Sequence, residues 1–161
     1  MKISPILNSP YTEPLRHFQS DERGLTETIA ESRRLSTIQI PLRKPRGKAA
    51  QANHDPAAQA WSSERLKENE FVNKVRVKVN EWRKAGYPGT TKTTQNLLRY
   101  WTDDTRENKL FFCQIEALET LIYINEVAEK IGEHWIINEL KKQSQDANPG
   151  LYRLAFKLAT G

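Results

Sequence analysis

The sequence contains a single cysteine, Cys113, so no disulfide bond can form within the chain. It has no run of the roughly 20 apolar residues that a membrane-spanning helix needs. The first residues, MKISPIL, lack the apolar core of a signal peptide. We therefore expect a cytoplasmic protein. Cys113 lies in an apolar run without metal-type spacing, which favours a buried side chain over a zinc ligand or a nucleophile.

Apolar residues are also scarce, at 37% of the chain, while charged residues make up 28%. This composition predicts one thin core with long polar segments. The formal net charge is +5 and the pI is about 9.3. Such a charge suits a polyanionic partner such as nucleic acid, although many soluble proteins share it.

Proline is concentrated near the N-terminus, where six of the eight prolines fall within the first 56 residues. Each proline removes a backbone donor and restricts its neighbour, so residues 1–60 are expected to form an irregular arm. Within it, residues 25–34 favour short turns or a strand. Residues 36–42 alternate Ile38 and Ile40 with polar side chains, which predicts a short edge strand that ends at Pro41.

A basic segment follows, with four cations among residues 43–48: Arg43, Lys44, Arg46 and Lys48. Two interpretations are open. The segment is either a solvated linker or a tail that follows a phosphate backbone, where each cation adds salt-dependent affinity.

Helical periodicity dominates from residue 64 onward. Apolar spacing predicts a helix over residues 64–86 with Val75, Val79 and Trp82 on one face. Three more helices are expected: 92–101 with Thr91 as its cap, 112–131 ending at Gly132, and 133–145. Residues 153–158 alternate apolar and polar side chains, which predicts a strand.

Two short elements are candidates for ligand binding. Gln114 carries a side-chain amide that could pair with both polar groups on an adenine edge, and Phe111 or Phe112 could stack on the base. The alternative is that Gln114 is an ordinary first-turn residue and that both phenylalanines belong to the core. The predicted strand at 153–158 leads into Ala159-Thr160-Gly161, which matches the start of a phosphate-binding loop but is also a common strand ending.

Taken together, these elements and several others resemble the N-terminal region of superfamily II helicase-type proteins, in particular the group similar to the Res subunit of type III restriction endonucleases. The resemblance spans nearly the whole chain. It is carried by SPYTEPLRHF (9–18), DERG (21–24), ESRRLS (31–36), Ile40-Pro41, WRKAGYPG (82–89), LLRYW (97–101), FFCQIEALET (111–120), ANPG (147–150) and LAFKLATG (154–161).

The resemblance implies a fold. The chain would be an α/β protein, a mostly helical N-terminal fragment of a P-loop, RecA-like helicase motor domain with an irregular proline-rich arm. Residues 1–60 would be the arm and basic linker, 61–110 a helical extension, and 111–161 the start of the motor domain. In such proteins the final run continues into Ser-Gly-Lys-Thr, so the chain is expected to be the front part of a larger enzyme.

The resemblance also implies roles and partners. Gln114 would lie near adenine with Phe111 and Phe112 flanking the base, and Ala159, Thr160 and Gly161 would begin the phosphate loop. The full-length parent would bind ATP and Mg²⁺, act on DNA and associate with a methyltransferase subunit. These 161 residues lack the loop lysine and the acidic Mg²⁺ motif, so no residue is assigned as catalytic and no stable cofactor binding is expected. Two alternatives stay open: a small basic helical module that binds DNA, and an interaction domain for a partner subunit.

Overall fold

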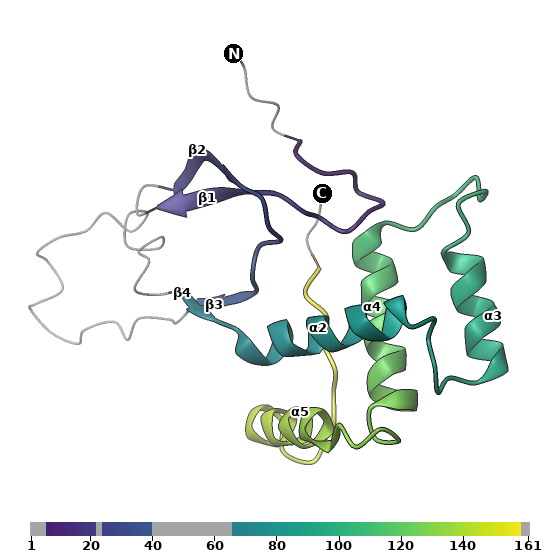
Figure 1. The fold of residues 1–161 in the computed structure, drawn as a ribbon. Helices are drawn as coiled ribbons and strands as arrows, with labels where there is room; N and C mark the ends of the chain where they lie inside the picture. Colours follow the sequence, from purple (N-terminus) through teal and green to yellow (C-terminus); the bar gives the residue numbers. More distant parts are fainter. Residues whose placement is uncertain (1–5, 22–23, 40–65, 159–161) are drawn as a thin grey trace, which may run out of the picture. The chain divides into compact units, whose positions relative to one another are not determined.

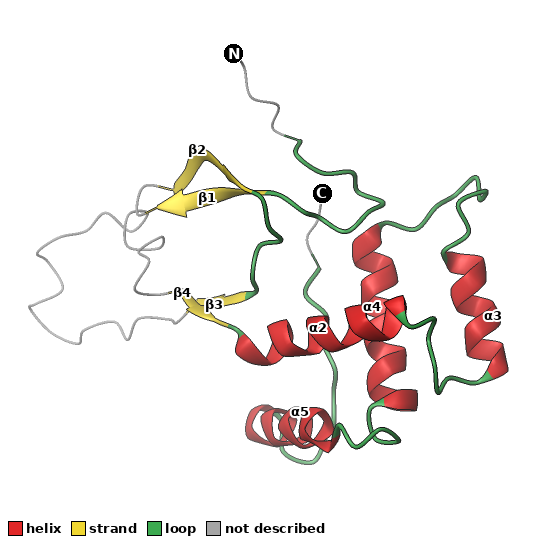
Figure 2. Ribbon diagram, viewed as in Figure 1, coloured by secondary structure: helices red, strands yellow, loops and turns green. Residues whose placement is uncertain are grey.

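The computed structural model describes residues 6–21, 24–39 and 66–158 (Figure 1). The chain groups into two compact units. One comprises Met1–Ser9 and Pro14–Asn73, and the other comprises Pro10–Glu13 and Lys74–Gly161. All the described strands belong to the first unit, and the helices belong mainly to the second (Figure 2). The mixed helix and strand content agrees with the sequence prediction, and each unit is described by itself. The predicted division at residues 60 and 110 stays a prediction.

The first unit contains two antiparallel strand pairs. β1 (His17–Asp21) pairs with β2 (Gly24–Ala30), and β3 (Thr37–Gln39) pairs with β4 (Leu66–Glu68). The strand predicted at 36–42 is confirmed over Thr37–Gln39, while its remainder lies outside the described residues. β2 overlaps residues 25–34, where a strand was one of the two expected structures, whereas β1 was not foreseen in the arm expected over residues 1–60. No proline interrupts the chain between Pro14 and Pro41, so backbone donors and acceptors there are free to pair across strands.

α2 (Glu70–Lys84) follows β4 and buries the face that the apolar spacing predicts: Val75, Val79 and Trp82. Its expected start at residue 64 is wrong, because β4 occupies Leu66–Glu68. The helix begins instead after Asn69, whose Oδ1 accepts a hydrogen bond of 3.2 Å from the backbone N–H of Val72. The predicted end is confirmed. Gly86 has a φ of 81°, a left-handed conformation that glycine adopts without strain.

α3 (Lys92–Trp101) agrees with the prediction at both ends. The Oγ1 atom of Thr91 accepts a 3.2 Å hydrogen bond from the N–H of Thr94 and caps the helix. Thr94 also donates its hydroxyl to Glu126 at 2.6 Å, and the N–H of Thr91 donates to the same carboxylate at 3.1 Å. The side chains of Thr94 and Leu98 are buried, so they form the inner face of α3.

α4 (Phe112–Ile122) continues directly into a π-helical turn, η3 (Tyr123–Val127), where a single helix over 112–131 was expected. The N–H of Ala128 donates to the carbonyl of Tyr123 at 2.8 Å, the i to i+5 pairing of a π-helix. Leu121, which precedes this turn, and Ile131, which follows it, are exposed although the regular apolar stripe includes them.

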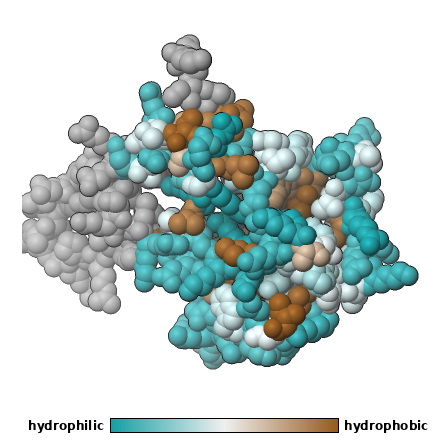
Figure 3. All heavy atoms as spheres, in the orientation of Figure 1, coloured by the Kyte–Doolittle hydropathy of each residue, from teal (hydrophilic) through white to brown (hydrophobic). Residues whose placement is uncertain are grey.

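α5 (His134–Ala147) begins close to the predicted residue 133 and contributes the fully buried Ile136. The core of the second unit is small, as the composition predicts. Its buried apolar residues are Val75, Val79, Trp82, Leu98, Tyr123, Ile124, Val127, Ala128 and Ile136. The face drawn in Figure 3 is mostly hydrophilic, with hydrophobic side chains in separate patches. Within the described residues, no helix has the length and apolar character needed to span a membrane.

Residues 151–158 have no regular secondary structure, so the strand predicted at 153–158 is wrong. The Oγ atom of Ser144 donates to the carbonyl of Leu151 and accepts from the N–H of Arg153, both at 3.2 Å. Side-chain alternation makes a segment compatible with a sheet, but a strand forms only where another strand pairs its backbone. Within the described residues, no strand pairs with this segment.

Candidate functional site

The first turn of α4 holds the glutamine that the sequence singled out. Phe111 precedes the helix in an extended conformation, with φ −66° and ψ 150°. Its N–H donates a 2.9 Å hydrogen bond to Oε1 of Gln114, and the N–H of Phe112 donates to the carbonyl of Pro10 at 2.8 Å. These two bonds satisfy backbone donors that a helix start leaves unpaired. The first of them also holds the Gln114 side chain at the start of the helix.

Two aromatic rings lie beside this turn. The centroids of Tyr11 and Phe111 are 5.5 Å apart, and the ring planes are tilted by 39°. Both residues are partly exposed to solvent, Tyr11 by 48% and Phe111 by 45%. We call Tyr11, Phe111 and Gln114 the aromatic–amide surface. It offers planar apolar area next to an amide, a combination suited to a flat heteroaromatic ring.

The structure separates the two adjacent phenylalanines. Phe111 belongs to the aromatic–amide surface, whereas the ring of Phe112 lies under the guanidinium of Arg83, 5.2 Å from its centre. Phe112 also lines a neighbouring cleft. Tyr11 touches both regions, because it packs on Phe111 and lines the cleft as well. Phe111 and Gln114 are thus brought together as expected, and Phe112 faces a different environment.

The cleft has a volume of about 190 Å³. Its aromatic lining consists of Tyr11, Tyr87, Trp101 and Phe112. Asp103 lies at its polar side, where the N–H and hydroxyl of Thr105 donate to one carboxylate oxygen at 2.8 and 2.7 Å. These hydrogen bonds hold the pKa of Asp103 below its usual value, so the carboxylate stays ionised.

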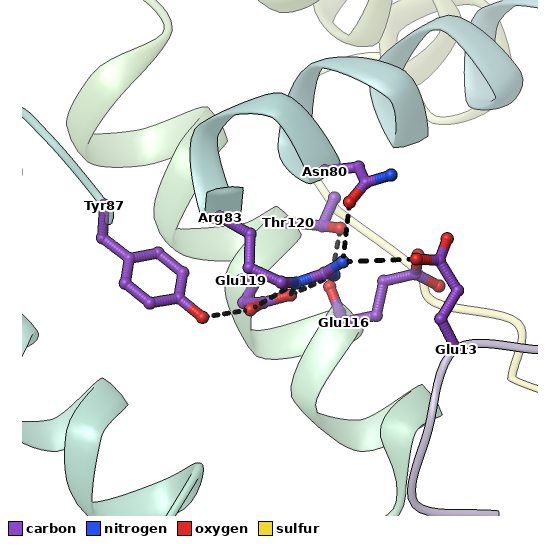
Figure 4. Close-up of polar contacts among 7 residues, drawn as sticks. All are labelled: Glu13, Asn80, Arg83, Tyr87, Glu116, Glu119 and Thr120. Carbon is purple, nitrogen blue, oxygen red and sulfur yellow. Dashed lines mark hydrogen bonds and ion pairs between the residues drawn. The ribbon is translucent and has the colours of Figure 1, made fainter. Parts of the chain in front are cut away.

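A buried ion pair also lines the cleft (Figure 4). The side chain of Glu119 is fully buried in α4. Its oxygens accept from Arg83 Nε at 2.9 Å, from Arg83 Nη2 at 2.5 Å and from the Tyr87 hydroxyl at 2.7 Å. The other guanidinium nitrogen, Nη1, lies 3.3 Å from Asn80 Oδ1 and 4.0 Å from a carboxylate oxygen of Glu13. Arg83 therefore joins α2, α4 and the segment Pro10–Glu13.

The protonation states in this cluster follow from burial and pairing. Burial lowers the pKa of Arg83, but the hydrogen bond and charge of Glu119 outweigh it, so the pKa of Arg83 is raised. Burial, followed by the hydrogen bond to Glu119, raises the pKa of Tyr87. The guanidinium is consequently charged and the phenol protonated throughout the neutral range. Such a cluster holds positions and is not built to exchange protons near pH 7.

Sequence patterns do not reveal this cluster. Arg83 lies on the mixed charged face of α2, which is normally solvated, and Glu119 belongs to a helix with an apolar stripe. The two are 36 residues apart along the chain, so only the tertiary fold brings them together. Tyr11 is even more distant from Phe111. Its only signal was its place in the N-terminal stretch that carries the family resemblance.

The remaining predicted site residues lie outside the described part of the chain. They are the phosphate-loop residues Ala159, Thr160 and Gly161 and the basic residues Arg43, Lys44, Arg46 and Lys48. Within residues 6–21, 24–39 and 66–158, no cluster of three or more His, Cys, Asp or Glu side chains is arranged to hold a metal ion. Comparison with family models, curated proteins and solved structures found no match for this chain.

Proposed function

We propose that this chain is the N-terminal part of an ATP-dependent DNA helicase or translocase, of the kind found in type III restriction enzymes. The proposed role of the aromatic–amide surface is to bind the adenine ring of ATP. The observation that supports this most directly is the placement of Gln114 at the start of α4, beside the exposed rings of Phe111 and Tyr11.

Gln114 keeps hydrogen-bonding capacity for a base. Its Oε1 already accepts from the N–H of Phe111, but a carbonyl oxygen has two lone pairs and the amide nitrogen has two donors. Adenine offers an acceptor at N7 and a donor at N6, which complement an amide in a bidentate pair. Guanine offers two acceptors at the corresponding edge, so an amide with a fixed orientation discriminates between the two bases.

The phosphates and Mg²⁺ require other groups in this proposal. Ala159, Thr160 and Gly161 would form the beginning of the phosphate loop. The lysine and the acidic residues that complete such a site are not among these 161 residues. No residue of this chain is therefore proposed as catalytic. The further partners would be DNA, a methyltransferase subunit and the rest of the motor domain, in the cytoplasm.

A nucleotide titration followed by NMR tests the base site. AMP is expected to shift the Gln114 side-chain amide and the Phe111 and Tyr11 resonances of the whole chain, with a dissociation constant on the order of 1 mM. GMP should shift them less. Equal responses to AMP and GMP, or shifts confined to other residues, would contradict the proposal.

The matched variant is Gln114→Glu. Glutamate keeps an oxygen that can accept from the N–H of Phe111, so the start of α4 is preserved. It lacks the amide donor that adenine N7 needs, so the affinity for AMP should fall severalfold while the melting temperature stays near that of the unmodified chain. An unchanged affinity for AMP would show that Gln114 does not contact the base.

DNA sequence provides an independent test of the larger enzyme. Reading in frame past codon 161 is expected to give Ser-Gly-Lys-Thr. A stop codon there, with no such sequence in frame, would favour the alternative of a small basic module that binds DNA or a partner subunit.

A further inference from the structure

We infer that Arg83 is a positioning residue for the aromatic–amide surface, and that it acts through Glu13 and Phe112 without touching the bound base. This inference rests on the proposed function of that surface. It concerns how the surface is assembled from two distant parts of the sequence, the segment Pro10–Glu13 and the start of α4.

The buried carboxylate of Glu119 fixes the orientation of Arg83. The guanidinium is planar, and its Nε and Nη2 atoms both donate to Glu119. Once these two nitrogens are held, the direction of the third nitrogen, Nη1, is set by the rigid geometry of the group. The hydroxyl of Tyr87 contacts the other side of the same carboxylate and limits its movement.

The third nitrogen points toward the N-terminal segment. In Figure 4, Nη1 of Arg83 lies between Asn80 and Glu13, and its distance to the Glu13 carboxylate is 4.0 Å. Glu13 is two residues from Tyr11. The carbonyl of Pro10 accepts from the N–H of Phe112, so the segment is attached on both sides of Tyr11. Two anchors of this kind restrict where the Tyr11 ring can lie relative to Phe111.

The same guanidinium acts on the helix side. It covers the ring of Phe112, 5.2 Å from the centroid, a distance at which a cation and an aromatic face attract each other. Phe112 is the first residue of α4 and adjoins Phe111. One side chain thus contacts a neighbour of each ring in the surface. Lysine could supply the charge for Glu119, but a single ammonium cannot also maintain the planar contacts to Phe112 and Glu13.

Two substitutions separate positioning from stability. Arg83→Lys keeps a counter-charge for Glu119 but removes the planar group. Glu13→Gln removes the charge of the outer partner and leaves the buried pair intact. Each is expected to weaken the nuclear Overhauser effects between the Tyr11 and Phe111 rings in the whole chain. Each should also lower the affinity for AMP about fivefold, the size of one lost partly exposed ion pair or cation–π contact.

Glu129→Gln is the matched control, because Glu129 is an exposed glutamate in the same unit and its substitution makes the same change in charge. It should change neither the ring contacts nor the affinity. The melting temperature of the Glu13→Gln variant should also stay at the value of the unmodified chain. A lower affinity for AMP at an unchanged melting temperature would show that the Arg83–Glu13 contact positions the surface and does not merely stabilise the fold.

The outcomes are distinct. If the ring contacts and the AMP affinity survive in the folded Arg83→Lys and Glu13→Gln variants, the inference is overturned. If the unmodified chain does not bind AMP, the proposed function fails. Loss of the Tyr11–Phe111 contacts in both variants would then still support Arg83 as the residue that positions the two rings.

Discussion

Removing the arginine of the Arg83–Glu119 pair should be far more costly than removing the glutamate. In Arg83→Met, the fully buried Glu119 loses three of its four hydrogen-bond contacts and its counter-charge. Leaving a buried charge unpaired typically costs about 3–5 kcal/mol of unfolding free energy. For a unit of this size, that corresponds to a loss of roughly 12–40 °C in melting temperature.

Two further variants, Glu119→Met and the double variant, provide the comparison for the free energy of unfolding of Arg83→Met. In Glu119→Met, the Arg83 side chain is 21% exposed and can reach water or Glu13, so we expect a loss of only about 1–2 kcal/mol. The double variant Arg83→Met/Glu119→Met removes both charges and replaces them with apolar side chains. Such replacements are often neutral or stabilising, so the double variant should be more stable than Arg83→Met alone.

Urea and thermal unfolding of the whole chain, followed by circular dichroism at 222 nm, measures all three variants. The reasoning is refuted if Arg83→Met loses less than about 1 kcal/mol, a size typical of an exposed pair. It is also refuted if the double variant is no more stable than the single one. Either result would mean that Glu119 is not held as a buried, charged group.

Three further predictions concern pH, catalysis and DNA. The hydrogen bond from Thr94 holds the pKa of Glu126 below its usual 4.5, so its contribution to stability is present above pH 4.5 and is lost as the pH falls through the lower folded-state value. Acid unfolding of Glu126→Gln should lack this component, and an identical pH profile would count against the contact. The purified chain should hydrolyse ATP no faster than a buffer blank, and measurable turnover would contradict the proposal that no residue of this chain is catalytic. DNA binding should weaken steeply with salt, and neutralising the basic segment 43–48 should reduce the slope of log K against log [salt] by up to about 0.9 for each cation that contacts a phosphate. Salt-independent binding would argue against phosphate contacts.

Local signals in the sequence predict the helices of the second unit well. Thr91 is a capping residue next to a short apolar pattern, and α3 begins and ends where that pattern indicates. Gly86 has a positive φ of about 80° and follows α2, as its position in the sequence predicts, whereas the helix expected to reach residue 131 ends at Val127, before Gly132. These features depend on neighbouring residues, so they can be read from a single chain.

Features that depend on distant residues could not be predicted in the same way. Leu66–Glu68 continues the apolar pattern of a helix, yet it pairs with Thr37–Gln39 as a strand. Residues 153–158 show the pattern of a strand, yet they form none in the described structure. In both cases, whether the segment forms a strand depends on the presence of a pairing strand and not on the segment's own sequence.

The candidate site likewise combines residues that are close in sequence with residues that only the fold brings near. Gln114 and Phe111 are neighbours in sequence, and their residue types alone indicate a surface for a planar ring. Tyr11, Arg83 and Glu119 complete and support it from other parts of the chain, and their role depends on the fold. A buried carboxylate cannot be distinguished from a solvated one by its place in a helical pattern.

The π-helical turn at Tyr123–Val127 has a consequence for engineering. A π-turn is an α-helix with one residue too many, so a single deletion there should restore a regular helix. Each residue turns an α-helix by about 100°. If all residues were kept in a regular α-helix, Val127 and Ala128 would rotate out of the core, or Glu119 would rotate away from Arg83; the wide turn absorbs the extra residue, so deleting the exposed Asn125 should leave both halves in place. The extra residue sets the rotation between the two halves of one continuous helix. Glu119 in the first half can therefore face Arg83 while Val127 and Ala128 in the second half face the core.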